Sequence, residues 1–335
     1  MPAARLTRRA WFAAAACLAQ GGGEGIVMTV RGPVPPEKLG LMLPHEHLFS
    51  NFGEDPAEPP VYDEPRLLEA VIPQARRVKE LGCSAIADAT AAWFGRSPRL
   101  LRIISQRTGL HVLTNTGYYG AASDRYVPKH AFEESPAALA ARWVREWREG
   151  IRETGIRPGF LKIGVDSGPL SDIDAKLIRA AALAHRESGL TIAVHTGGNP
   201  EAARQQMAIL REEGVSPEAW IWVHANQAPP GEEAALEEAA RAGVWVSLDG
   251  LDETSAGRHL ELVLRLRKKG CLARLLLSHD GNSFRAGGKR PARGYTFLFE
   301  RFLPMLRTAG LSAAEIKRLT VENPARAFAI RRRLI

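Results

Sequence analysis

Residues 41–47 read LMLPHEH, a short apolar run that ends in two histidines, His45 and His47. Side chains two positions apart on a β-strand point to the same face, so a strand here directs both imidazoles to one side of a sheet. Further short runs rich in Val, Ile, Leu and Ala follow along the chain, at residues 84–88, 112–116, 160–165, 191–195, 221–224, 244–249 and 275–280. Their almost continuous apolar character is typical of parallel strands that are covered on both faces.

Longer stretches with helical periodicity separate these runs, and they predict helices over residues 64–81, 137–154, 173–188, 200–213 and 232–242. Ser171 and Asp174 have the spacing of a capping box, and Gly189 marks the C-terminal end of the helix that they open. Ser312 with Glu315 opens another helix after the last strand.

Eight successive strand–helix units predict one α/β domain, a (β/α)₈ barrel of the TIM type. An open, doubly wound sheet is the alternative. Such a sheet usually carries a glycine-rich phosphate-binding turn, and the sequence contains no G-x-G-x-x-G or Walker motif. A barrel places its active site at the C-terminal ends of the strands, so the residues at those positions are the candidates for chemistry.

The composition is that of an ordinary soluble protein. The chain has 335 residues, of which 45% are hydrophobic and 24% are charged, and this balance excludes disordered and collagen-like classes. No apolar run approaches the roughly 20 residues of a membrane-spanning helix. The formal net charge of +8 is modest for this length, and no nucleic-acid-binding motif accompanies it, so nucleic acid is not an expected partner.

The first 25 residues are expected to be an export signal, with residues 26–335 forming the barrel. Arg8-Arg9 precedes the short apolar stretch 10–19 and a glycine-rich exit, a pattern similar to twin-arginine signals. This predicts a periplasmic or secreted protein. The alternatives are a lipid attachment at Cys17, or a frayed N-terminal arm on a cytoplasmic protein. The other two cysteines, Cys83 and Cys271, are expected to be packed thiols, and no C-x-x-C pair suggests a thiolate zinc site.

Polar side chains stand at the ends of several predicted strands: His45, His47, Asp88, Lys162, His195, His224 and Asp280. Each of them alone fits a blander role, such as a hydrogen-bonded core histidine or an aspartate that caps a loop. Together, at one barrel mouth, they would be a costly set of buried polar groups without a shared purpose. A metal cluster supplies that purpose, because neutral imidazoles and carboxylates are ligands of transition metals.

Lys162 is the unusual member, because an ammonium group cannot coordinate a metal ion. Its amine can react with CO₂ to give a carbamate, an anion whose two oxygens are able to bridge two cations. The ordered motifs HEH (45–47), Lys162, HT (195–196), VH (223–224) and SHD (278–280) resemble the phosphotriesterase family of the amidohydrolase superfamily. The resemblance extends from TVRGPVPPEKLGLMLPHEH near the start of the chain to LTVENPARAF near its end.

The resemblance implies a binuclear metal site formed by six residues: His45, His47, Lys162, His195, His224 and Asp280. His45, His47 and Asp280 would hold the more buried ion. The carbamate on Lys162 would bridge it to a more exposed ion, held by the other two histidines. Zinc is the expected metal, with Mn²⁺, Co²⁺ or Fe²⁺ as alternatives.

The family resemblance also implies hydrolysis, in which a metal-bridging hydroxide attacks and Asp280 accepts its proton. The expected substrate is an ester, best a lactone. Phosphotriesters and N-acyl amino acids are alternatives within the family, and a metal-free ligand-binding relative is the alternative that is not an enzyme. Tyr119, in NTGYYG, occupies the place where lactonases of the family carry a tyrosine, although it could also be a packed loop aromatic.

Two further features bear on the substrate. Asp249 is followed by Gly250, where the family commonly has histidine or arginine, and Asp249 itself could hydrogen-bond a ligating histidine. Arg285, Lys289, Arg290 and Arg293 crowd the loop after the last strand, which suggests attraction of an anionic substrate, although a solvated charged loop is equally compatible. The resemblance further suggests a homodimer.

Overall fold

The computed structural model of the chain describes residues 25–288 and 291–335. The predicted export signal, apart from its last residue, lies outside the described residues. Lys289 and Arg290 of the basic loop also lie outside them.

All eight predicted strand segments form strands, and their bounds are β3 (Met42–Glu46), β4 (Ala85–Asp88), β5 (His111–Leu113) with β6 (Asn115–Thr116), β7 (Phe160–Gly164), β8 (Thr191–His195), β9 (Trp220–Val223), β10 (Trp245–Leu248) and β11 (Leu275–Leu277). They pair in parallel, in the order β3-β4-β5 in one sheet and β11-β10-β9-β8-β7-β6 in another. Each strand therefore lies beside its neighbour in sequence, as expected when every connection is a helical crossover.

The two sheets approach one another at both ends of the series. Only Thr114 separates β5 from β6. At the other end, the backbone N–H of His45 donates to the hydroxyl of Ser278 at 3.0 Å, and the N–H of Asp280 donates to the carbonyl of His45 at 3.2 Å. These contacts bring the end of β3 next to the chain that leaves β11, so the first and last predicted strands contribute to one site.

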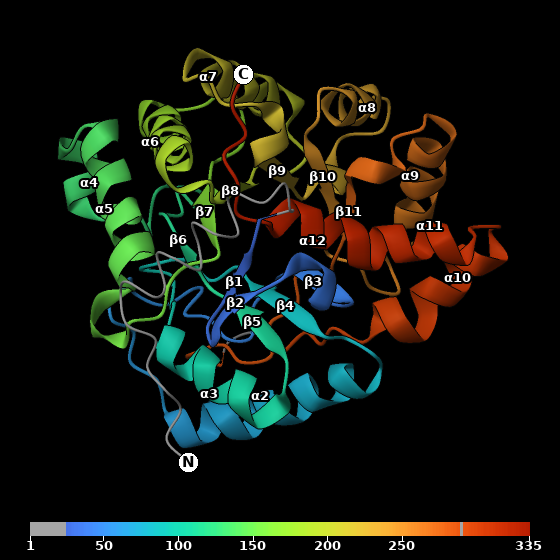
Figure 1. Ribbon diagram of the computed structural model, residues 1–335, viewed down its shortest axis with the longest axis horizontal. Coiled ribbons are helices and arrows are strands. Elements are labelled where there is room, and N and C mark those ends of the chain that lie inside the picture. The colour runs from blue at the N-terminus through green and yellow to red at the C-terminus, as the bar shows by residue number, and fades with distance from the viewer. Residues whose placement is uncertain (1–24, 289–290) are drawn as a thin grey trace.

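Helices lie around the central strands (Figure 1). Their bounds are α2 (Glu64–Glu80), α3 (Pro98–Thr108), α4 (Lys129–Glu133), α5 (Pro136–Glu149), α6 (Asp172–Ser188), α7 (Pro200–Glu212), α8 (Ala234–Arg241), α9 (Ala256–Lys268), α10 (Leu303–Thr308), α11 (Ala313–Lys317) and α12 (Asn323–Phe328). A short antiparallel hairpin, β1 (Val27–Thr29) and β2 (Gly32–Val34), precedes β3. Each strand is therefore covered by helices on one face and by the side chains of other strands on its other face. Burial on both faces explains the apolar sequences of the strands.

Two helix predictions need correction. The helix expected over 137–154 ends at Glu149, because Gly150 takes a positive φ of 101°, and a separate 3₁₀ turn, Arg152–Thr154, follows. The capping box expected at the start of α6 is only half formed. The hydroxyl of Ser171 accepts from the N–H of Asp174 as expected, but the Asp174 carboxylate accepts from the N–H of Asp166.

The remaining local predictions are confirmed. Gly189 ends α6 in the left-handed conformation, and Ser312 with Glu315 forms a full capping box at α11. Cys83 and Cys271 are buried free thiols. Among the described residues, no helix is both long and apolar enough to cross a membrane.

Candidate metal centre

A pocket of about 390 Å³ opens where the strands end, and all six predicted metal ligands line it. Four further groups share its wall: the aromatic rings of Phe52, Phe94 and Tyr119, the amide of Asn282, the ring of Pro291, and the side chains of Arg285 and Arg293. Sequence segments more than 200 residues apart thus meet in a single concave site, which is where a parallel α/β fold is expected to bind ligands.

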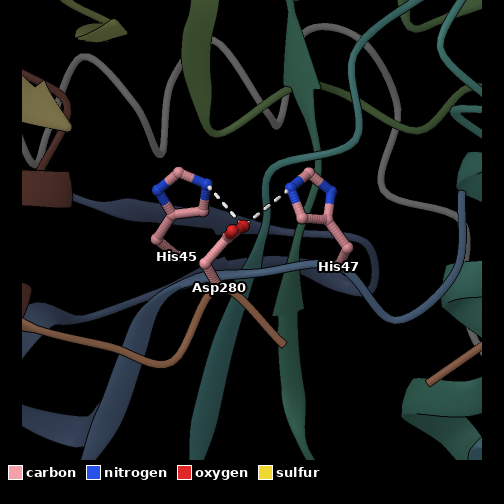
Figure 2. Close-up of side chains that lie close together, drawn as sticks. All are labelled: His45, His47 and Asp280. Carbon is pink, nitrogen blue, oxygen red and sulfur yellow. Dashed lines mark ion pairs between the residues drawn. The ribbon is translucent and has the colours of Figure 1, made fainter. Parts of the chain in front are cut away.

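His45, His47 and Asp280 form the most compact group in this pocket (Figure 2). Oδ1 of Asp280 lies 3.5 Å from Nε2 of His45 and 3.3 Å from Nε2 of His47. Within the described part of the chain, this is the one group of three such residues whose ligand atoms all lie within 4.8 Å of one another. The two histidines come from β3 and the stretch after it, as the two-residue alternation of LMLPHEH predicted.

The hydrogen bonds of His47 fix its protonation pattern. The hydroxyl of Thr90 donates to the carbonyl of Phe49 at 2.9 Å, so it accepts from Nδ1–H of His47, at 2.8 Å. A neutral imidazole with its proton on Nδ1 has a bare lone pair on Nε2. That lone pair faces the carboxylate oxygen of Asp280. Two acceptor atoms 3.3 Å apart need a cation between them, either a proton or a metal ion.

His195 and His224 lie next to this group. The His195 ring lies 4.6 Å from that of His224 between centroids, and the His224 ring lies 5.0 Å from that of His45. Burial lowers the pKa of all three histidines, in the case of His224 to about 4. These imidazoles are therefore neutral at physiological pH, which is the form that binds metal ions.

Lys162 projects from β7 into the same pocket and is 1% exposed. Its Nζ has no hydrogen-bond partner among the described residues. Burial lowers the pKa of this amine to about 8, which increases the fraction of free amine at neutral pH. An unsatisfied buried amine is costly, so this position indicates a group that further chemistry or a ligand completes.

Both His224 and Asp280 have left-handed backbone conformations, with φ of 62° and 50°. Hydrogen bonds from backbone N–H groups to buried carboxylates stabilise both strained conformations. For His224, the backbone N–H donates to Oδ2 of Asp249 at 2.9 Å. This bond agrees with the expectation that Asp249 hydrogen-bonds a ligating histidine. The bond is to the backbone of His224, and Oδ2 of Asp249 also lies 3.6 Å from Nδ1 of His45 and 3.7 Å from Nδ1 of His224.

Glu46 is the supporting residue that the sequence reasoning missed. Its fully buried carboxylate accepts from the hydroxyl of Ser278 (2.8 Å), from the backbone N–H of His279 (3.0 Å) and of Gly281 (2.6 Å), and from the His279 ring (2.9 Å). The alternation of β3 turns Glu46 away from the face of His45 and His47. A carboxylate at a buried position that faces the helices needs hydrogen-bond donors. The presence of Glu46 at such a position in the sequence could therefore have indicated its supporting role.

Tyr119 lines the pocket and lies edge-on to His195, with 5.3 Å between ring centroids. It also stacks on Phe94 at 5.0 Å, so it packs in a loop and reaches the site as well. Burial raises the pKa of its phenol, which keeps the hydroxyl protonated. Arg285, the other predicted substrate residue, also lines the pocket, as does Arg293.

The arrangement combines metal-ligand chemistry with a substrate-sized cavity. Neutral imidazoles, a carboxylate and a buried amine line it together with aromatic rings and arginines. Such a site can hold divalent cations and present a polar bond of a small molecule to them.

Known proteins with related sequences cover nearly the whole chain. It is 28% identical over 318 residues to a phosphotriesterase homology protein of Mycobacterium tuberculosis, covering 90% of this chain and 96% of that protein. It is 27% identical to an aryldialkylphosphatase of Saccharolobus solfataricus (90% and 99% covered) and 26% identical to an N-acetyltaurine hydrolase of Tetraodon nigroviridis (90% and 97% covered).

Solved structures of related proteins also match nearly the whole chain. A variant of an organophosphorus hydrolase from Deinococcus radiodurans matches with a TM-score of 0.82 at 28% identity, covering 92% of this chain and 98% of that one. A variant of a phosphotriesterase-like lactonase from the same organism matches with a TM-score of 0.80 at 28% identity, covering 90% and 99%. The phosphotriesterase family model matches residues 25–328, so this chain belongs to the phosphotriesterase family.

Proposed function

We propose that this chain is a metal-dependent hydrolase with a binuclear site at the mouth of a closed (β/α)₈ barrel, and that it cleaves an ester bond, best that of a lactone. One observation carries the proposal. The six residues expected to bind metal converge on one pocket, although they come from five different strand ends. Membership of a family of hydrolases supports the reaction class.

The residues fit a pair of divalent cations. Two atoms that each lie 2.0–2.1 Å from a tetrahedral zinc ion are about 3.3–3.4 Å apart. The distances of 3.3 and 3.5 Å from Asp280 Oδ1 to the two histidines match that spacing. His195 and His224 supply a second pair of neutral imidazoles, and Lys162 is placed to supply a carbamate between the two groups. Zinc suits this donor set best, and Mn²⁺, Co²⁺ and Fe²⁺ also suit it.

Bound divalent ions would lower the pKa of water toward neutrality and would polarise the carbonyl of the ester. The protein's own residues then have separate tasks. The Asp280 carboxylate, at the floor of the pocket, accepts the proton that is released as the nucleophile attacks. The Tyr119 hydroxyl, protonated and beside His195, orients the substrate. The rings of Phe52 and Phe94 exclude water and contact the apolar part of a lactone.

Phosphotriesters and N-acyl amino acids are the competing substrates. Related proteins carry the names aryldialkylphosphatase and N-acetyltaurine hydrolase, while a structural relative is a lactonase. The same nucleophile can attack phosphorus or an amide carbonyl, and specificity depends on the loops that surround it. The pocket alone therefore does not favour either alternative over the lactone.

The test is metal analysis followed by a substrate screen. Purified protein should contain about two divalent ions per chain, and a chelator should abolish hydrolysis, which added Zn²⁺ restores. The metal-loaded protein is then assayed on lactones, aryl esters, aryl phosphotriesters and N-acyl amino acids at equal concentration. We expect the highest kcat/KM on a lactone. Metal-free protein that binds these compounds without turnover would instead support the ligand-binding alternative.

The Lys162 carbamate has its own test. The variant Lys162→Ala should retain fewer than two ions per chain and lose hydrolysis, because it removes the group that is proposed to bridge the two ions. Protein loaded in ¹³C-bicarbonate should show a carbamate signal by NMR that is missing from the variant. An unchanged metal content in Lys162→Ala would contradict the bridge.

We also propose that the protein is exported and that it forms a homodimer. Residues 1–25 would direct the protein to the periplasm or outside the cell, which cell fractionation of the wild type and of an Arg8→Lys, Arg9→Lys variant tests. A purely cytoplasmic wild-type protein would exclude export. Light scattering of the purified protein tests the homodimer.

A further inference from the structure

We propose that Arg293 is a positioning residue for Asp280: its guanidinium holds one oxygen of the carboxylate, so that the other oxygen stays directed at His45 and His47. This role rests on the proposed function, to which it adds a residue that orients a candidate metal ligand. Three features of the molecule support it: the separate contacts of the two Asp280 oxygens, the backbone pairing of Arg293, and the close packing of the segment behind it.

The two carboxylate oxygens of Asp280 have different partners. Oδ1 lies 3.5 Å from Nε2 of His45 and 3.3 Å from Nε2 of His47. Oδ2 accepts a hydrogen bond of 2.9 Å from Nη2 of Arg293. Rotation about the Cβ–Cγ bond of Asp280 would turn Oδ1 away from the imidazoles, and the bond to Arg293 opposes that rotation. Carboxylates that bind metal ions are commonly oriented by such a hydrogen bond.

The contact with Arg293 also includes the backbone of Asp280. The same Nη2 donates to the carbonyl oxygen of Asp280, whose φ of 50° is unfavourable for a residue with a side chain. One guanidinium nitrogen therefore restrains both the peptide group and the carboxylate of a single strained residue. Hydrogen bonds from a cation to a carboxylate are among the stronger ones in proteins, so this restraint is substantial.

The backbone of Arg293 is held in register with the candidate metal ligands. Arg293 and Asn282 exchange two hydrogen bonds, of 2.8 and 2.9 Å, in an antiparallel bridge. Asn282 also pairs with His47 in a parallel bridge. The bonds of this second bridge run from His47 N–H to Gly281 O (2.8 Å) and from Ser283 N–H to His47 O (3.3 Å). Asn282 thus joins the backbone of His47 to that of Arg293.

The segment that follows Arg293 packs closely on the chain that leaves β11. A Cβ atom at Gly281 would lie 2.9 Å from the carbonyl oxygen of Gly294 and 2.6 Å from Cδ1 of Tyr295, so this approach requires glycine. Tyr295 is fully buried, and its hydroxyl hydrogen-bonds the hydroxyl of Ser283. The Arg293 side chain therefore starts from a defined position, two residues before a buried ring.

The charge of Arg293 opposes cation binding, whereas its hydrogen bonds favour it. The side chain is 47% exposed, so water and salt screen the repulsion between its guanidinium and a bound divalent ion. Loss of a group that orients a metal ligand typically lowers the metal affinity about 10- to 100-fold. We therefore expect the orienting effect of Arg293 to exceed the repulsion.

Metal binding tests this role without relying on turnover. Chelator competition measures the zinc affinity, and the visible spectrum of Co²⁺-substituted protein reports the ligand geometry. Arg293→Gln should lower the zinc affinity about tenfold or more and change the Co²⁺ spectrum, because the Asp280 carboxylate can then rotate. Arg293→Lys keeps the charge and a donor group, so it should recover part of the lost affinity.

Arg267→Gln is the matched control. Nε of Arg267 donates to Oε1 of Glu315 at 2.6 Å, and the Glu315 side chain is 21% exposed, as is that of Asp280. This pair joins α9 to α11, and neither residue lines the pocket. Its loss should leave the zinc affinity and the Co²⁺ spectrum unchanged. Wild-type values in Arg293→Gln, or a zinc affinity that rises because repulsion is relieved, would overturn the proposal.

Kinetics separate this role from the proposed function. With the best substrate of the screen, Arg293→Gln should lower kcat and leave KM nearly unchanged, because Asp280 takes part in the reaction rather than in substrate binding. Zinc affinity that depends on Arg293 in a protein without hydrolytic activity would refute the hydrolase function and support the positioning role. Hydrolysis together with an unchanged zinc affinity and Co²⁺ spectrum in Arg293→Gln would refute the positioning role alone.

Discussion

Asp280 depends on residues that never touch the pocket. Its left-handed backbone, at φ 50°, is unfavourable for a non-glycine residue, and the neighbouring chain must compensate. Glu46 does so by accepting from the N–H groups on either side, at His279 and Gly281. The carboxylate thereby fixes the direction in which the Asp280 side chain leaves the backbone. A residue on the helix-facing side of β3 in this way determines the geometry on the opposite side.

The substitution Glu46→Gln tests this dependence. The amide offers one acceptor oxygen, and its NH₂ group must face N–H or O–H donors that previously bonded to a carboxylate. We expect the zinc affinity to fall about 10- to 100-fold, as when other groups that orient metal ligands are removed. We also expect a loss of about 1–3 kcal/mol in the free energy of unfolding. Chelator competition measures the affinity, and the visible spectrum of Co²⁺-substituted protein reports the ligand geometry.

Glu69→Gln is the matched control, because Glu69 lies exposed on α2 and the same chemical change should there leave affinity, spectrum and stability unchanged. A Glu46→Gln protein that unfolds more easily but keeps the wild-type affinity and Co²⁺ spectrum would show that Glu46 stabilises the fold without positioning Asp280.

At the scale of elements, the sequence predicted the features that repeat regularly and missed individual contacts between distant segments. Parallel strands buried on both sides produce continuous apolar runs, so every predicted strand was found, and β8 matched at both ends. The polar residues at the strand ends follow from the same regularity. The hydrogen bonds around Asp280 are not periodic. They join β3 to a segment more than 230 residues away, and no local pattern shows which donors Glu46 will meet.

The sequence spacing predicts where a helix starts, but it does not show whether the side chain at the N-cap position makes the capping hydrogen bond. Ser171 and Ser97 both occupy N-cap positions, of α6 and α3. The hydroxyl of Ser171 accepts from the N–H of Asp174 at 3.2 Å, whereas Ser97 makes no such bond. The spacing suggested a full capping box at α6. The Asp174 carboxylate instead accepts from the backbone N–H of Asp166.

These two serines provide a matched pair of substitutions. Ser171→Ala should reduce the free energy of unfolding by about 1 kcal/mol, since it leaves an N–H of the first turn without its acceptor. Ser97→Ala removes no cap bond and should stay within about 0.5 kcal/mol of the wild type. Urea denaturation of both variants with a common m-value measures the difference. Equal losses in the two variants would mean that the α6 cap bond adds no stability.

At the scale of the whole molecule, the C-terminal residues stabilise the side of the fold where the strands begin, opposite the candidate site. The N–H of Arg333 donates to Nε2 of His185 at 2.9 Å, and the carbonyl of Arg333 accepts from the N–H of Ser216, also at 2.9 Å. The Arg333 side chain, 5% exposed, donates to the hydroxyl of Thr191 and to the carbonyl of Ala329. The last residues thus tie α6, β8 and the segment after α7 together, which favours a role in stability over a role in catalysis.

His185 makes the hydrogen bonds of the C-terminal segment sensitive to pH. Its Nδ1 bonds to the carbonyl of Leu190 at 2.8 Å, so Nδ1 is the donor, and Nε2 must stay unprotonated to accept from Arg333. Burial lowers the pKa of His185 to about 4, from about 6.5 in the unfolded chain. Between these values the unfolded state binds more protons than the folded state, so stability falls as the pH drops below about 6.5.

The pH dependence is measured as a difference between the wild type and His185→Gln. The variant lacks the titrating group and should be less stable than the wild type at pH 7. Its disadvantage should shrink by about 2 kcal/mol between pH 7 and pH 5, because only the wild type loses this contribution on acidification. Metal loss at low pH affects both proteins equally and cancels in the difference. A difference in the free energy of unfolding that stays constant over this range would mean that His185 does not remain neutral in the folded protein. The hydrogen bonds of the C-terminal segment would then not respond to pH through this residue.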